Sequence, residues 1–232
     1  MSRSRVMTLT PGLVAYCHRD VVDPGPSADT KYLLDSDFRP AALRLLALKP
    51  SGALWLFAYG SLIWKPEVAH SALRRATARG WHRAFSMKIQ RYRGTPEQPG
   101  YMMCLDRGGI CQGVVLQLLE GDLEGQIEKL LRREVSRQGG LEAVRWIDVE
   151  TDNGPLVALA FYAAPQYLEY YQADRPLAEI ARGLACACGH WGSGADYLYN
   201  TVSHLEQLGI HDEGLWELQE LVAHEIAALY HL

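Results

Sequence analysis

A chain of 232 residues with 48% hydrophobic content is long enough to bury a sizeable core in one enzyme-sized domain. Its formal net charge of −4 would attract neither nucleic acid nor an anionic membrane, so neither is expected as a partner. Five cysteines are an odd number and lack the spacing of a disulfide framework, which indicates reduced thiols in a cytoplasmic protein.

In chain order, the pattern predicts a helix near the start, then mainly strands interrupted by one helix, and finally a helical tail. The first helix is expected over 39–48, with Pro40 in its first turn, where a missing N–H is tolerated. Periodicity predicts strands over 54–59, 79–89, 101–105, 111–118, 145–150 and 156–162, and helices over 122–135, 177–186, 195–208 and 213–229. Strands followed by helices favour an α+β domain with a mainly antiparallel sheet that can close into a small barrel.

The first predicted strand ends in an unusual way. Its apolar run stops at Gly60-Ser61 and then resumes with Leu62 and an aromatic residue, Trp64. We expect Gly60 to take a positive φ and to allow close approach of a ligand, with successive N–H groups forming a concavity for a carboxylate or phosphate. A tight turn between two strands is the alternative interpretation.

The run YGSLIW at 59–64 resembles the signature loop of the ChaC family of γ-glutamylcyclotransferases. Further segments in the family's order cover roughly residues 54–208: GWHRAF at 80–85, RGTP at 93–96, QGVV at 112–115, RRE at 132–134 and DYL at 196–198. The resemblance implies a compact barrel flanked by helices. Residues 1–50 then form an N-terminal extension packed on a catalytic domain of residues 51–232.

The helix predicted over 122–135 places a carboxylate on its apolar face. Leu123, Ile127, Leu130 and Leu131 form a stripe that reaches Glu134 at the same spacing. Burial would raise the pKa of Glu134 into a range useful for a general base. Two alternatives stay open from the pattern alone: the helix ends at Glu134 and the side chain turns outward, or a neighbouring arginine, 133 or 137, pairs with it.

The resemblance implies an activity and a set of site residues. ChaC-like enzymes convert glutathione to 5-oxoproline and cysteinylglycine without a cofactor, and the glutamate in this Arg-Glu context, Glu134, is their acid/base. Backbone donors of the loop are expected to hold the substrate carboxylate or the developing oxyanion, Arg93 to meet the glycine carboxylate, and Tyr197 to reach the γ-glutamyl group. The loop residues are Tyr59, Gly60, Ser61 and Leu62.

Two features limit what the resemblance implies. Gly139-Gly140 is followed by Leu141, where family members commonly have an aromatic residue, and its spacing from Glu134 is longer, so the resemblance does not extend to a substrate contact from that segment. Cys186, Cys188 and His190 have the composition of a metal site, but no further ligand pair has zinc spacing, and no metal is predicted.

Two competing functions remain open. One is a noncatalytic ligand-binding or regulatory module that keeps the anion-binding loop; the other is cyclotransfer on another γ-glutamyl amine or amino acid. A carboxylate on the apolar face at Glu134 argues against the first, because a binding module gains nothing from it.

Overall fold

The computed structural model describes residues 6–28, 30–164 and 171–232 and divides into two compact units. One unit comprises residues 26–84 and 104–169, which we call the barrel unit, and the other comprises residues 1–25, 85–103 and 170–232, the helical unit. The division crosses two long strands. Each unit is described by itself.

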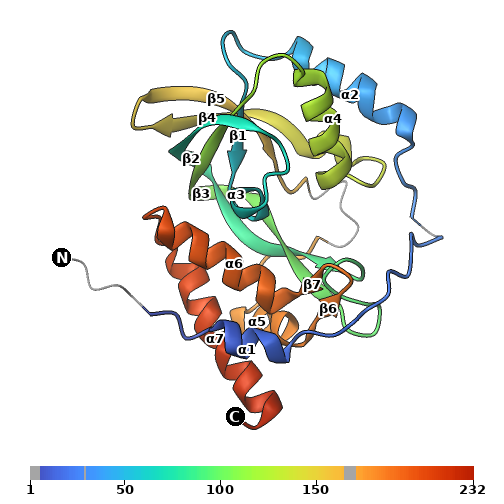
Figure 1. Cartoon of the computed structure of the whole chain (residues 1–232), viewed down its shortest axis with the longest axis vertical. Coiled ribbons are helices and arrows are strands. Elements are labelled where there is room, and N and C mark those ends of the chain that lie inside the picture. Colours follow the sequence, from blue (N-terminus) through green and yellow to red (C-terminus); the bar gives the residue numbers. More distant parts are fainter. Residues whose placement is uncertain (1–5, 29, 165–170) are drawn as a thin grey trace. The chain divides into compact units, whose positions relative to one another are not determined.

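The barrel unit is built on a closed five-stranded barrel with the order β1-β3-β2-β4-β5 (Figure 1). Strand β1 pairs antiparallel with β3, β2 with β4, and β4 with β5, whereas β1 and β5 pair in parallel, with Leu56 opposite Leu159. The strands are β1 (Trp55–Ala58), β2 (His70–Ile89), β3 (Gly100–Leu118), β4 (Val144–Thr151) and β5 (Gly154–Phe161). The predicted α+β class with a mainly antiparallel barrel and flanking helices is therefore confirmed.

Four helical segments complete this unit: α2 (Asp35–Ala47), α3 (Ser61–Trp64), α4 (Leu123–Glu134) and the short 3-10 helix η1 (Gly140–Ala143). Helix α2 packs alongside α4 (Figure 1). The barrel interior is filled by aromatic and aliphatic side chains from every strand, among them Trp55, Phe57, Leu105 and Ile147. All four residues of β1 are buried, which explains its continuous apolar sequence.

In the helical unit, the helices α1 (Pro11–Tyr16), α5 (Leu177–Cys186), α6 (Gly194–Gln207) and α7 (Glu213–Tyr230) pack together (Figure 1). The two-residue strands β6 (Cys188–Gly189) and β7 (Gly192–Ser193) join α5 to α6. Each of the three long helices contributes fully buried side chains, such as Leu184, Leu198 and Val222. Among the described helices, none has the length and apolar character needed to cross a bilayer.

Helix α2 corrects one prediction. It begins at Asp35 and not at residue 39, because Asp37 accepts a hydrogen bond from the Leu34 N–H at 2.8 Å and stabilises an earlier start. Pro40 therefore lies inside the helix, where it lacks the N–H that would bond to the Ser36 carbonyl.

The second correction concerns the long strands. Residues 79–89 belong to an unbroken strand that starts at His70, and the two short strands predicted over 101–105 and 111–118 form the single strand β3. The residues between them include Gly108 and Gly109, whose φ values of 97° and 70° are accommodated within one strand. The short helices α1 and α3 were not predicted from the sequence.

Gly113 in β3 lies where a side chain would collide with the strand that leads to the loop. A Cβ there would lie 2.4 Å from the Ala58 carbonyl oxygen and 3.1 Å from the Phe57 ring. We expect Gly113→Ala to lower the free energy of unfolding by about 1–3 kcal/mol, as overpacking typically does. Urea denaturation would measure it, with Gln112→Ala at the exposed neighbouring position as the control. Equal stability of the two variants would contradict this packing argument.

Candidate functional site

The loop at 59–62 joins the end of β1 to the single helical turn α3. Gly60 is buried and stands as the N-cap of α3, and its carbonyl accepts a hydrogen bond from the Ile63 N–H at 2.9 Å. Its φ is −141°, so the predicted positive φ is wrong. The strand passes straight into a helical turn, and that connection does not need a left-handed residue. Leu62 is buried, whereas Tyr59 and Ser61 are half-buried.

Two arginines from other elements hold this loop. Arg83 in β2 is buried, with only 9% of the residue's surface exposed. Its Nη1 donates a hydrogen bond to the Tyr59 carbonyl at 2.9 Å. From α4, Arg133 donates from Nη2 to the Ser61 hydroxyl at 3.2 Å and from Nη1 to the Lys65 carbonyl. The loop is thus bonded at its start and at its end. These charge-assisted bonds fix the backbone of the segment that the sequence singles out.

Glu134 is the last residue of α4, one turn beyond the end of the predicted stripe, and its role in the site stays a prediction. Ile127, Leu130 and Leu131 are buried. The Glu134 side chain exposes 24% of its surface, while the residue as a whole is exposed through its backbone at the helix end. The two alternatives left open by the sequence are both realised in part, because the helix ends here and the Nε of Arg133 lies 2.9 Å from Oε1 of Glu134.

The pKa of Glu134 lies above its ordinary value of 4.5. Desolvation is the largest cause, because surrounding protein disfavours the charged carboxylate; the Arg133 guanidinium opposes it, and the Glu67 carboxylate adds to it. A carboxyl group whose pKa is raised by burial and moderated by one arginine holds a proton more readily than an ordinary glutamate, which a group that must both accept and return a proton needs.

Arg93 and Tyr197 belong to the helical unit and contact each other there. The guanidinium of Arg93 lies 5.3 Å from the centre of the Tyr197 ring, and Nη1 donates to Asp196 Oδ2 at 2.9 Å and to the Ser193 carbonyl at 2.8 Å. The ring of Tyr197 is buried and meets Phe85 edge-on at 5.9 Å. These contacts fix the two side chains relative to each other, and their roles toward a substrate stay predictions.

The predicted site residues therefore form two groups. In the barrel unit, Arg133 contacts both the loop residue Ser61 and Glu134. In the helical unit, Arg93 contacts both Tyr197 and Asp196 in the first turn of α6. Sequence reasoning did not propose Arg83 or Arg133 as functional residues. Arg83 lies within the matched segment at 80–85, and Arg133 was considered only as a partner of Glu134, so both carried a usable signal.

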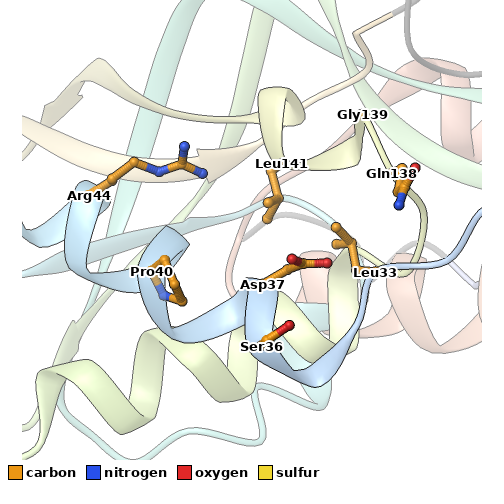
Figure 2. Close-up of a pocket in the computed structure, with 8 residues that line it drawn as sticks. All are labelled: Leu33, Ser36, Asp37, Pro40, Arg44, Gln138, Gly139 and Leu141. Atoms are coloured by element: carbon orange, nitrogen blue, oxygen red, sulfur yellow. The ribbon is translucent and has the colours of Figure 1, made fainter.

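A separate pocket of about 420 Å³ lies in the barrel unit between α2 and η1 (Figure 2). Asp37, Pro40 and Arg44 lie on one face of α2, with Leu141 of η1 opposite them (Figure 2). It contains none of the predicted site residues. Leu141, the residue that departs from the family pattern, is thus part of the wall between η1 and α2.

Comparison with known proteins decides the family. Residues 54–225, about three quarters of the chain, match the profile of the ChaC-like protein family. The chain belongs to the ChaC-like family. The match starts at the β1 strand and includes the loop, Glu134, Arg93 and Tyr197.

Similar proteins come from bacteria and animals. The glutathione-specific γ-glutamylcyclotransferase of Escherichia coli K12 is 36% identical over 189 residues, which cover 80% of each chain. The human glutathione-specific γ-glutamylcyclotransferase 1 is 31% identical over 161 residues, covering 68% of this chain and 72% of that protein.

A solved structure supports the fold of this ChaC-like chain. The crystal structure of a γ-glutamylcyclotransferase specific to glutathione from yeast superimposes with a TM-score of 0.65, covering 75% of this chain and 97% of that one. At 20% identity, this likeness supports the fold alone.

Proposed function

We propose that this protein is a γ-glutamylcyclotransferase that acts on glutathione and releases 5-oxoproline and cysteinylglycine. The observation that carries the proposal is Glu134, a carboxyl group of raised pKa that Arg133 connects to the Ser61 hydroxyl in the signature loop. The similar proteins from E. coli and human are named glutathione-specific γ-glutamylcyclotransferases, which supports the proposal. A module that only binds a ligand has no use for a proton-accepting carboxyl group at this position.

The reaction needs few protein groups because the substrate contains both reacting atoms. The α-amine of the γ-glutamyl residue attacks its own γ-carbonyl carbon, a C–N bond closes the five-membered ring, and the amide C–N bond to cysteine breaks. Holding the flexible side chain in the ring-closing conformation can contribute on the order of 7 to 11 kcal/mol when orientation is ideal.

Glu134 handles the proton in this scheme. It takes a proton from the attacking nitrogen and returns it to the departing amide nitrogen, so one carboxyl group acts first as base and then as acid. Backbone donors around Tyr59, Gly60, Ser61 and Leu62 hold the substrate carboxylate or the developing oxyanion. Arg93 and Tyr197 are proposed to contribute to binding of the γ-glutamyl peptide.

The cytoplasm is the proposed location. None of the five cysteines is in a disulfide, and four of them are buried, which fits a reducing compartment. Glutathione is abundant and reduced under such conditions.

Varying the leaving group of the substrate tests whether the enzyme is specific for glutathione. Glutathione and γ-glutamyl-alanine share the reacting half, so a glutathione enzyme is expected to give a much higher kcat/KM with glutathione, with 5-oxoproline followed by mass spectrometry. Equal kcat/KM values for the two compounds would replace the glutathione-specific assignment by a general γ-glutamyl amine cyclotransferase.

Ser61 gives a milder prediction. Ser61→Ala removes the acceptor of one Arg133 hydrogen bond but leaves the loop backbone and the ion pair with Glu134 in place. We expect a loss of about 2- to 13-fold in kcat/KM, because this long, part-buried bond of 3.2 Å is expected to contribute only about 0.5–1.5 kcal/mol although its donor is charged. Steady-state kinetics measures it. A loss as large as that from removing Glu134 would mean that the Ser61 hydroxyl takes part in the chemistry itself.

A further inference from the structure

Arg133 uses all three nitrogens of its guanidinium group, and each faces a different part of the candidate site. Nε lies 2.9 Å from the Glu134 carboxylate, Nη2 donates to the Ser61 hydroxyl at 3.2 Å, and Nη1 donates to the Lys65 carbonyl. Its side chain is only 13% exposed. An arginine that is this buried and bonded on every side is held in one conformation, and so are the groups that it contacts.

The position of Glu134 explains why such a contact is needed. It is the last residue of α4, and the chain turns to an extended conformation at Val135, so no further helical turn restricts its side chain. A glutamate loses up to about 2 kcal/mol of rotamer entropy when it is ordered, and without a partner it would sample several positions. The ion pair with Arg133 selects the one in which the carboxylate meets the same guanidinium group that bonds to Ser61.

The same contact balances the charge of the carboxyl group. Desolvation and the Glu67 carboxylate both raise the pKa of Glu134, and Arg133 is the charged group that lowers it. Oε1 of Glu67 lies 3.4 Å from Nζ of Lys65 and 4.0 Å from Nη1 of Arg133. Removing the Arg133 charge would leave both pKa-raising influences unopposed, and Glu134 would remain protonated to a higher pH.

We propose that Arg133 is a positioning residue that fixes the Glu134 carboxylate relative to the loop and keeps it ionised for the first proton transfer. This inference rests on the proposed cyclotransferase function. Lysine is not an adequate replacement, because one ammonium group cannot reproduce three nitrogens in a planar fork that face a carboxylate, a hydroxyl and a carbonyl. Arginine is therefore required for geometry as well as for charge.

The test is the pH dependence of kcat/KM for glutathione in the wild type and in Arg133→Gln, Arg133→Lys and Arg132→Gln. Arg132 is the matched control, because it carries the same charge one residue earlier but points to Glu128 and Asp35 on the outer side of α4. We expect Arg133→Gln to lower kcat/KM by about 10- to 100-fold at neutral pH, which corresponds to one hydrogen bond to a charged group. We also expect the acid limb of its pH profile, where kcat/KM falls as Glu134 becomes protonated, to move to higher pH.

The remaining variants separate geometry from charge. Arg133→Lys is expected to keep its acid limb closer to that of the wild type while kcat stays low, because charge is retained and orientation is lost. Arg132→Gln should keep both the rate and the limb. Ser61→Ala should lower the rate without moving the limb, and it serves as the second test if Arg133→Gln does not fold by circular dichroism.

The outcomes distinguish the inference from the proposed function. If the wild type forms no 5-oxoproline, the function itself fails. If the wild type is active and Arg133→Gln has the same acid limb, or if Arg132→Gln moves the limb equally, Arg133 does not control Glu134 and the inference is overturned.

Discussion

Replacing Glu134 by glutamine is expected to lower kcat by about 10²- to 10⁴-fold or more, the usual contribution of a general acid–base group. The amide keeps the size and polarity of the side chain and can still accept the bond from Arg133, but it cannot take a proton at neutral pH. Turnover of glutathione followed by mass spectrometry measures the loss. Activity near that of the wild type would remove Glu134 from the mechanism.

The same variant carries its own control for folding. Because the pKa of Glu134 in the folded state is raised, ionising it opposes folding, and this destabilisation is absent below the unfolded pKa near 4.5 and grows as pH rises. Glutamine does not titrate. Glu134→Gln should therefore gain Tm relative to the wild type between pH 4 and pH 8. A Tm difference that stays constant over this range would contradict the raised pKa.

Blocking the substrate amine is expected to abolish the reaction completely. In N-acetylglutathione the nitrogen lone pair is delocalised into the acetyl carbonyl and is no longer nucleophilic, so the compound should yield no cysteinylglycine at any concentration. An amidase that uses water would still cleave the γ-amide and release N-acetylglutamate, which is the result that contradicts cyclotransfer. Competitive inhibition of glutathione turnover by an excess of the acetylated compound would establish that the acetylated compound still binds.

The sequence was most informative where local pattern and fold agree. Helix α5 has the predicted bounds, and α4 differs by one residue at each end, because each has a strong apolar stripe and a clear stop. The two long barrel strands were predicted less well. Whether Gly108 and Gly109 interrupt a strand depends on its pairing with a distant strand, and local composition does not contain that information.

At the candidate site, too, the features set by local sequence were predicted and those set by tertiary contacts were not. Residue types and spacing were sufficient to single out the loop and Glu134, since an apolar run ending at Gly-Ser and a carboxylate on an apolar stripe are both visible in one dimension. The backbone angle of Gly60 and the contacts of Arg83 and Arg133 depend on which elements meet in space. An arginine that binds a carbonyl in the folded chain looks, in the sequence, like any solvated arginine.

The product formed first from unmodified glutathione tests the central claim most directly. Purified protein incubated with glutathione, sampled early and analysed by mass spectrometry, is predicted to give 5-oxoproline and cysteinylglycine in equal amounts with no glutamate. Glutamate as the first-formed product would point to hydrolysis by water and would contradict cyclotransfer.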